Sequence, residues 1–279
     1  MRRLAGLVLA ALTAAGCAPG RTVVPVRMQP AAALAAPPAA LDLSSHEATV
    51  RSVAGVIVRD LGLPLPDTVT VYVYSSRSIF EQGLVDDGHV SRIRAAELSD
   101  FAAGVGKRRQ LLLLHHEANV ASAEWVRLVA HELAHVSQIE LAEGEGRAEQ
   151  WLAEGMAEWV AFRVLERLRL DTVVRRRLVA VEAVRDHEPV MARRLDLATL
   201  GTPRGFTVRH LREGSQPTYQ LAYLLADYLI ARDGLDGVVG YFRSFATRGD
   251  RRGNFAAAFG QSLEDFEQEA LAHLAKFAH

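Results

Sequence analysis

The stretch HELAH, residues 131–135, is the most chemically specific pattern in the sequence. On an α-helix, two histidines four residues apart project from one face, so His131 and His135 can bind a single Zn²⁺ through their imidazoles. Glu132 follows the first histidine directly, and its carboxylate can reach a water molecule on that metal. The other residues from 129 to 136 are uncharged, as expected of a helix that is buried behind a metal ion. The spacing therefore predicts a zinc site with Glu132 as its general base.

A catalytic zinc site needs a third protein ligand and an open position, and Glu154 is the expected third ligand. It lies in WLAEGMAEW, residues 151–159, and the 18 positions from 136 through 153 separate it from His135. That distance is sufficient to end one helix, turn at the glycines 144 and 146, and place a second helix antiparallel to the first. Glu158 lies one turn beyond Glu154 on the same face. It either accepts a hydrogen bond from a ligand imidazole or is an ordinary exposed carboxylate, and both interpretations stay open.

Two strands are expected ahead of these helices. Thr68–Tyr74 (TVTVYVY) alternates and is rich in β-branched and aromatic residues, which is typical of a half-buried strand. The run Gln110–His116 (QLLLLHH) is short and apolar, which favours a strand that is covered on both faces. His115 and His116 are adjacent on it and point to opposite faces, so they are not expected to share a metal.

Helical periodicity or turn signals mark the other elements. The first helix is expected after Leu43 and ends at Leu61, before Gly62 and Pro64. The later predicted helices are Ser75–Gln82, Ala121–Leu141, Arg147–Leu170, Val173–Val184, Pro217–Arg232, Leu235–Thr247 and Leu263–Phe277. Mixed strands and helices come first and helices alone follow, which predicts an α+β fold with its elements segregated.

The composition limits the classes of function. The chain has 279 residues, of which 49% are hydrophobic, which is enough for one large domain or two small ones with a real core. Its net charge is -1, so no strong positive field is present to gather nucleic acid. With a single Cys, neither an intramolecular disulfide nor a metal site of several cysteines can form.

The N-terminus has the layout of an export signal. Two arginines precede an apolar run from Leu4 to Ala15, and small residues stand immediately before Cys17. The run is too short for a permanent membrane helix. It resembles a bacterial lipoprotein signal, which implies residues 1–16 as the signal and a lipidated Cys17 that holds the protein at a membrane of the cell envelope, facing the periplasm. Because Ala14 stands where Leu is usual, ordinary secretion with a free Cys is the alternative.

An Ala- and Pro-rich stretch follows the predicted signal and shapes the expected domain boundaries. Residues 17–42 hold five prolines, which remove backbone donors and fix φ, so a semi-extended tether is expected there. The catalytic domain is then expected to span residues 43–279.

HExxH, a gap of 18 residues and then WLxEG resemble the gluzincin metallopeptidases, a group that includes the peptidase MA-like families and is related to aminopeptidase N and thermolysin. The resemblance implies a zincin-like catalytic domain with a small mixed sheet and an active-site helix, followed by a mainly helical C-terminal part. It also implies that His131, His135 and Glu154 bind zinc and that Glu132 activates water.

The same resemblance implies a downstream tyrosine that stabilises the oxyanion. The segment YQLAYLLADYL, residues 219–229, resembles the family's tyrosine-bearing helix, and Tyr219 at its start is the first candidate. Tyr223, one turn later, and His210 are the competitors, and a tyrosine packed in a helical core is the alternative to any such role.

One feature of the family is missing from the sequence. Aminopeptidases of this kind carry a Gly-x-Met-Glu-Asn strand whose Glu binds the substrate's free amine, and no such motif precedes His131. Glu117 in LHHEAN has a similar place, but its neighbours do not match. Internal cleavage is therefore at least as consistent with the sequence as removal of N-terminal residues.

The predicted function is zinc-dependent hydrolysis of peptide bonds in peptides or proteins of the cell envelope. The alternative from another class is a zinc-stabilised envelope protein that binds a peptide or an assembly partner without hydrolysing it. In a third interpretation the HELAH helix is plain core without a metal, but two histidines and a glutamate on a buried face would then need other partners.

Overall fold

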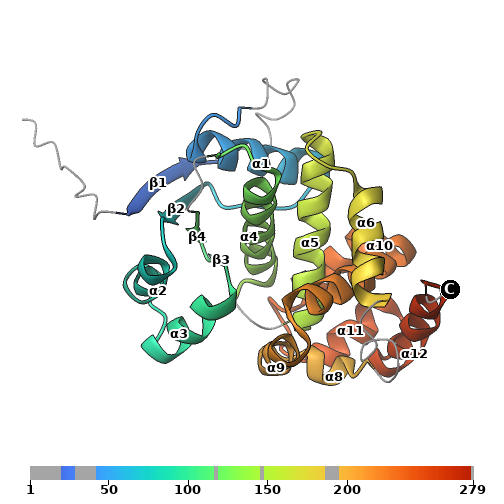
Figure 1. Ribbon diagram of the computed structural model, residues 1–279. Coiled ribbons are helices and arrows are strands. Elements are labelled where there is room, and N and C mark those ends of the chain that lie inside the picture. The colour runs from blue at the N-terminus through green and yellow to red at the C-terminus, as the bar shows by residue number, and fades with distance from the viewer. Residues whose placement is uncertain (1–19, 29–41, 116–118, 145–147, 186–194, 278–279) are drawn as a thin grey trace, which may run out of the picture.

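A mixed four-stranded sheet forms the N-terminal side of the molecule (Figure 1). The computed structural model describes residues 20–28, 42–115, 119–144, 148–185 and 195–277. The strands are β1 (Arg21–Arg27), β2 (Thr68–Tyr74), β3 (Gly104–Lys107) and β4 (Gln110–Leu114), in the order β1-β2-β4-β3. β2 and β4 are parallel, and the two outer strands are antiparallel to their neighbours, so that Val71 pairs with both Val24 and Leu111.

The helices follow the order along the chain that the sequence predicted, with additions. They are α1 (His46–Leu61), α2 (Arg77–Asp86), α3 (Arg92–Phe101), α4 (Ala123–Ala142), α5 (Gln150–Arg167), α6 (Val173–Arg185), α8 (Leu197–Leu200), α9 (Pro203–Glu213), α10 (Ser215–Ser244), α11 (Arg251–Phe259) and α12 (Leu263–Leu274), and a 3₁₀ turn (Ala275–Phe277) ends the described chain. The α+β class with a mainly helical C-terminal part is confirmed.

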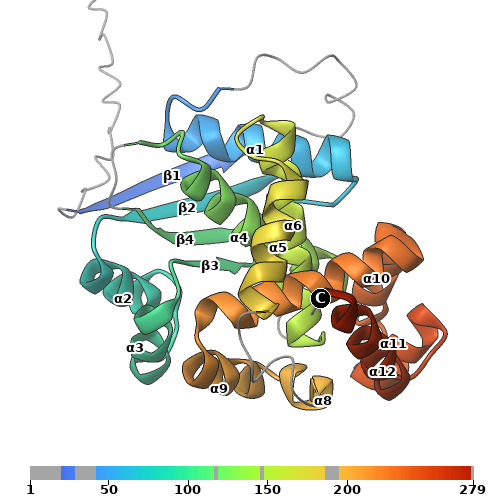
Figure 2. The same ribbon diagram turned by 45° about the vertical axis from the view of Figure 1, so that its right-hand side comes forward.

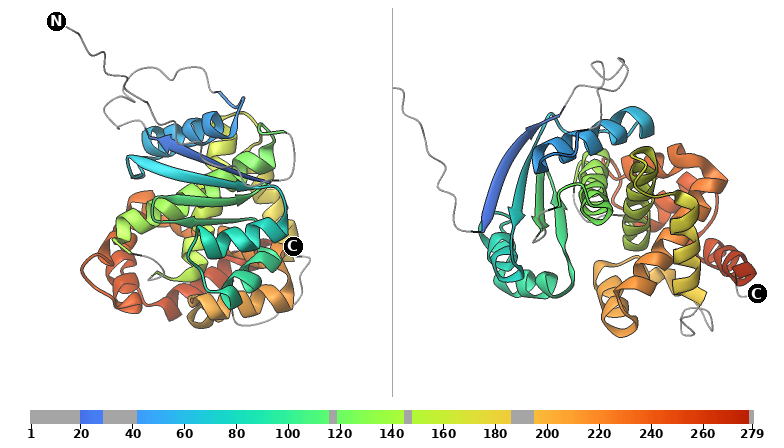
Figure 3. Two further views of the ribbon diagram at one scale, coloured as in Figure 1. Left: turned by 90° about the vertical axis from the view of Figure 1, so that its left-hand side faces the viewer. Right: turned by 45° about the horizontal axis from the view of Figure 1, so that its top comes forward.

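Most of the helices are stacked in layers on one side of the sheet. α1 and α4 pack against the sheet, α5 lies beyond α4, and α10 crosses α5 and α6 (Figures 2 and 3). α11 and α12 lie at the end of the molecule farthest from the sheet. α4 and α5 run side by side in opposite directions, as the glycine-marked break between them predicted.

Both faces of the sheet are covered. Leu111 and Leu113 face the large core that α1, α4 and α5 share, whereas Leu112 and Leu114 face a smaller cluster with α2 and α3. The four consecutive leucines therefore form a strand that is buried on both faces, which confirms the interpretation of that run.

Strand β1 lies inside the stretch that was expected to be a tether. It pairs along its whole length with β2, and Val26 is fully buried in the main core. The folded domain therefore begins before Leu43, at least for the described residues 20–28. Pro25 sits within this strand, which an edge strand tolerates because it leaves one side of the backbone unpaired. Residues 1–19, which hold the predicted signal and Cys17, and residues 29–41 lie outside the described residues.

Two predicted helices are one element with a kink. The segments 217–232 and 235–247 join in α10, where Gly234 has φ 80° and ψ 162°. Glycine adopts a positive φ without steric cost, so the chain bends there. Among the described residues, none of the helices combines the length and the apolar character that a membrane span requires.

Candidate metal centre

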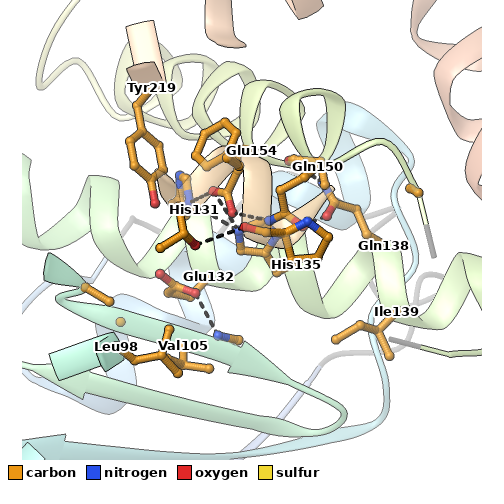
Figure 4. A pocket seen from close by; sticks show the side chains of 18 of the residues that line it. Leu98, Val105, His131, Glu132, His135, Gln138, Ile139, Gln150, Glu154 and Tyr219 are labelled. Atoms are coloured by element: carbon orange, nitrogen blue, oxygen red, sulfur yellow. Dashed lines mark hydrogen bonds and ion pairs between the residues drawn. The ribbon is translucent and has the colours of Figure 1, made fainter. Parts of the chain in front are cut away.

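Two helices bring the predicted ligands together (Figure 4). His131 and His135 lie on α4, and Glu154 lies on the neighbouring α5. The Nε2 atoms of the two histidines are 3.2 Å apart, and Oε2 of Glu154 lies 3.2 Å from Nε2 of His131 and 3.4 Å from Nε2 of His135. This group is the one set of three candidate ligands that the described part of the chain brings within 4.8 Å of one another.

The three donors suit a zinc ion. Two imidazole nitrogens and one carboxylate oxygen form a donor set that catalytic zinc sites use, with one position left for water or substrate. All three side chains are nearly buried, and their donor atoms point to a common centre. The same set could also hold another divalent transition metal, because these ligands discriminate between such ions only weakly.

Each ligand is held by a further polar group. Nδ1 of His131 lies 3.3 Å from the buried carboxylate of Glu158, which is in turn paired with Arg127 on α4. Glu158 is therefore buried beside a ligand and not exposed. Nδ1 of His135 lies 2.9 Å from the side-chain oxygen of Gln138. Such contacts fix the tautomer and orientation of a ligand imidazole.

Glu154 and Gln138 are also held by hydrogen bonds. The amide of Gln150 donates to Oε1 of Glu154 at 2.7 Å, which leaves Oε2 to face the histidines. The amide nitrogen of Gln138 donates to the backbone oxygen of Ala153 at 2.8 Å and so connects α4 to α5. Neither glutamine was predicted from the sequence.

Charges around the site set the protonation of its members. Burial alone would lower the pKa of His131, but Glu154 and Glu158 outweigh it and raise this pKa to about 10. Burial would raise the pKa of Glu158, but the Arg127 guanidinium and the His131 imidazole lower it to about 2. For Glu132, burial dominates and raises the pKa, although the nearby imidazoles oppose it. A raised pKa suits a carboxylate that takes up and releases a proton.

Edge strand β3 holds Glu132 from the side of the sheet. The backbone N–H of Gly106 donates to Oε2 of Glu132 at 2.7 Å. A Cβ on Gly104 would lie 2.7 Å from the Glu132 side chain, and a Cβ on Gly106 would lie 2.4 Å from the Glu132 backbone oxygen. Two glycines are therefore required for the strand to approach the helix this closely. This strand was missed, because two glycines in four residues are a weak signal for a strand.

Of the three oxyanion candidates, Tyr219 lies nearest the metal ligands. Its ring centroid is 6.3 Å from that of His131, and burial raises its pKa well above 10, which keeps the phenol protonated. Tyr223 is fully buried and packs against Phe162, with ring centroids 4.7 Å apart, so it is part of the hydrophobic core. The ring of His210 packs edge-on against the ring of Tyr219, with 5.9 Å between the ring centroids.

His115, which follows β4, is separate from this centre. Nδ1 of His115 lies 3.0 Å from Nε2 of His46, and its ring stacks on Trp125. His116 and Glu117 lie outside the described residues.

Two adjoining cavities open onto the metal ligands. Both are bounded by Phe101, His131, Glu132 and Tyr219, and they extend toward opposite ends of α4. The cavity toward the end of α4 has about 270 Å³ and is lined mainly by apolar side chains, including Leu98, Val105, Ile139, Phe206 and Phe242. The cavity toward the start of α4 has about 370 Å³ and includes several charged side chains. An extended ligand that filled both would pass directly over the metal ligands.

No protein-family model, no curated protein and no solved structure matches the chain.

Proposed function

We propose that this protein is an exported zinc metallopeptidase of the gluzincin type, with a zincin-like catalytic domain. One observation carries the proposal: His131, His135 and Glu154 converge on one point while Glu132, on the same helix, faces the same cavity. When bound, Zn²⁺ supplies Lewis acidity, which lowers the pKa of water and polarises a carbonyl group. A purely structural zinc site would give Glu132 no evident role.

The chain's own residues account for the proton transfers. Glu132 accepts the proton of the attacking water and delivers it to the leaving amine, and the N–H of Gly106 holds its carboxylate in place. The phenol of Tyr219 donates a hydrogen bond to the oxygen on which negative charge develops. Glu158 and Gln138 orient the two ligand imidazoles.

The place of action follows from the N-terminal sequence. The arginines, the apolar run and the small residues before Cys17 support export and a lipid anchor, so the proposed substrates are peptides or proteins of the cell envelope. These residues lie outside the described part of the chain.

The test compares the wild-type protein with Glu132→Gln and Glu154→Ala. Wild type should bind about one zinc per chain and cleave members of a mixed peptide library. Glu132→Gln should keep its zinc but lose at least about 10²-fold in turnover, because it removes the general base and not a ligand. Glu154→Ala should lose zinc affinity. Glu47→Gln, an exposed carboxylate on α1, is the matched control and should behave as wild type.

The outcomes separate the two classes of function. Full turnover in Glu132→Gln would refute the mechanism. If wild type and Glu132→Gln both bind zinc and neither cleaves peptides, the result would favour the non-hydrolytic binding protein.

A further inference from the structure

The cavity toward the start of α4 contains two arginines, Arg127 on α4 and Arg176 on α6. They share this cavity with the candidate ligand His131 and with Glu132. Ser215, Gln216 and Gln220 add polar groups from α10. This end of the cleft therefore differs from the apolar cavity on the other side of the metal centre.

A single carboxylate bridges the two arginines. Nε of Arg127 donates to Oε2 of Glu124 at 3.0 Å, and Nη2 of Arg176 donates to Oε1 of the same residue at 3.1 Å. Each carboxylate oxygen of Glu124 thus accepts a hydrogen bond from one guanidinium group. The pair of arginines is arranged as a receptor for one carboxylate group.

The arginines are held from behind by other groups. Arg127 is paired with Glu158, whose side chain is 3% exposed, and Arg176 donates through Nε to Asp171 at 2.6 Å, whose side chain is 6% exposed. The guanidinium of Arg176 also lies 5.6 Å from the centre of the Phe162 ring. Both cations would therefore keep their positions if Glu124 moved away.

Glu124 is held far less firmly. Its side chain is 66% exposed, and it lies in the first turn of α4. Its carboxylate is paired with the same two arginines. An exposed carboxylate gains little net free energy from such pairs, because water solvates it almost as well. It can be displaced by a ligand that brings its own carboxylate together with further contacts.

We propose that this cavity is a carboxylate-binding subsite in which Arg127 and Arg176 bind a carboxylate of the substrate after displacing Glu124. The inference rests on the proposed peptidase function and specifies its substrate class: a peptide with a carboxylate near the scissile bond. That carboxylate is either an acidic side chain or the free C-terminus of the peptide. Both sources present the same carboxylate group. Replacement of Glu by Gln removes the side-chain carboxylate, whereas amidation removes the C-terminal one.

The experiment measures binding and not turnover. The full chain with Glu132→Gln, loaded with zinc, is titrated into fluorescein-labelled alanine–leucine peptides of about ten residues. One Glu is moved along the series, each peptide has a Gln counterpart, and each is made with a free and an amidated C-terminus. Anisotropy gives the Kd of each peptide.

A carboxylate subsite should make one acidic peptide, or the free C-terminus, bind roughly tenfold more tightly than its neutral counterpart. Arg176→Gln should abolish that preference and leave the affinity for neutral peptides unchanged. Loss on replacing Glu by Gln identifies a side chain, and loss on amidation identifies the terminus. Arg176 is the better target because Arg127 also contacts Glu158 and so affects a metal ligand.

Glu124→Gln supplies a second, opposite test. Removal of the competing charge should tighten binding of the acidic peptide severalfold, and a misfolded chain cannot produce such a gain. Arg51→Gln and Glu47→Gln, an exposed pair on α1, are matched controls that should change nothing.

The inference is overturned if acidic and neutral peptides bind alike. It is also overturned if the preference survives Arg176→Gln, because another group would then bind the carboxylate. If the Glu132→Gln protein prefers acidic peptides but the wild type hydrolyses none, the peptidase function is refuted and the carboxylate subsite stands. If the wild type hydrolyses peptides but acidic peptides are not preferred, the subsite is refuted and the peptidase function stands.

Discussion

At the scale of single residues, Glu149 is a buried carboxylate that the metal centre does not use. It is fully buried at the start of α5, with Oε1 2.8 Å from Nε of Arg251. Burial raises its pKa to about 7, although Arg251 opposes the shift. Gly201 packs against it so closely that a Cβ there would lie 1.5 Å from Oε2. The native fold therefore favours the protonated acid.

This shift gives a stability prediction with a definite sign. Well below pH 4.5, Glu149 is protonated in both the folded and the unfolded chain. As pH rises toward 7 the unfolded chain releases its proton first, so the contribution of Glu149 to the free energy of unfolding falls, and above pH 7 the full penalty remains. Glu149→Gln lacks this penalty. Its free energy of unfolding relative to wild type should therefore rise by up to about 3 kcal/mol between pH 4.5 and pH 8.

Urea denaturation of both proteins at several pH values measures that difference. Any constant effect of losing the Arg251 contact appears equally at every pH and does not disturb the comparison. A difference that stays flat from pH 4.5 to pH 8 would show that folding does not shift the pKa of Glu149.

The sequence was sufficient for residues whose positions follow from spacing within one helix or from the pairing of two consecutive helices. His131, His135 and Glu154 meet as predicted because a four-residue spacing and an antiparallel helix pair determine their positions. Gln138, Gln150 and Arg127 were not identified as supports. Their partners are chosen by contacts across elements or by side-chain rotamers, which no residue pattern along one helix specifies.

At the scale of elements, the crossing of α5 over α10 determines where Tyr219 stands relative to Glu154. A Cβ on Gly155 would lie 2.1 Å from the backbone oxygen of Ala222 and 2.8 Å from Cβ of Ala226. The two helices are therefore in backbone contact at this point. A larger residue must push the two helices apart, and Glu154 on α5 and the phenol of Tyr219 on α10 would move apart with them.

Gly155→Ala should accordingly destabilise the protein by about 1–3 kcal/mol, because overpacking exceeds the roughly 1 kcal/mol that Ala gains in helix propensity. Gly240→Ala on α10 is the matched control. Nothing lies within 4 Å of its Cβ position, so the same substitution should be neutral or stabilising by up to about 1 kcal/mol. Thermal unfolding of the two variants beside wild type measures both effects. Equal stability of the two variants would mean that the crossing can relax.

The elements that the sequence analysis missed have weak local signals. β3 contains two glycines in four residues, a composition that strands disfavour, and it forms because α4 and β4 lie on either side of it. β1 contains Pro25 and lies in an Ala- and Pro-rich stretch. Both are edge strands, in which tertiary pairing and not propensity decides the structure.

At the scale of the whole molecule, the fold class and the order of the predicted elements followed from hydrophobic periodicity, but the start of the folded domain did not. The sheet begins at Arg21, and the strand that follows Gly20 contributes to the same core as α1, α4 and α5. Val26 and Met28 from this segment are 0% and 6% exposed. The fold therefore depends on residues that lie well before the predicted domain start at Leu43.

A chain of residues 43–279 should consequently be much less stable than one of residues 20–279. It loses the burial of two large apolar side chains, worth about 1.5–3 kcal/mol each, and it leaves the β2 edge unpaired and open to association. Urea denaturation and size-exclusion chromatography measure the two effects.

Two point variants of the longer chain separate the effect of the strand from the effect of chain length. Val26→Asp should reproduce the instability, whereas Val23→Asp, on the opposite face and 43% exposed, should be tolerated. If residues 43–279 unfold at the same urea midpoint and slope as the longer chain, β1 contributes nothing to the stability of the domain and the boundary at Leu43 is correct.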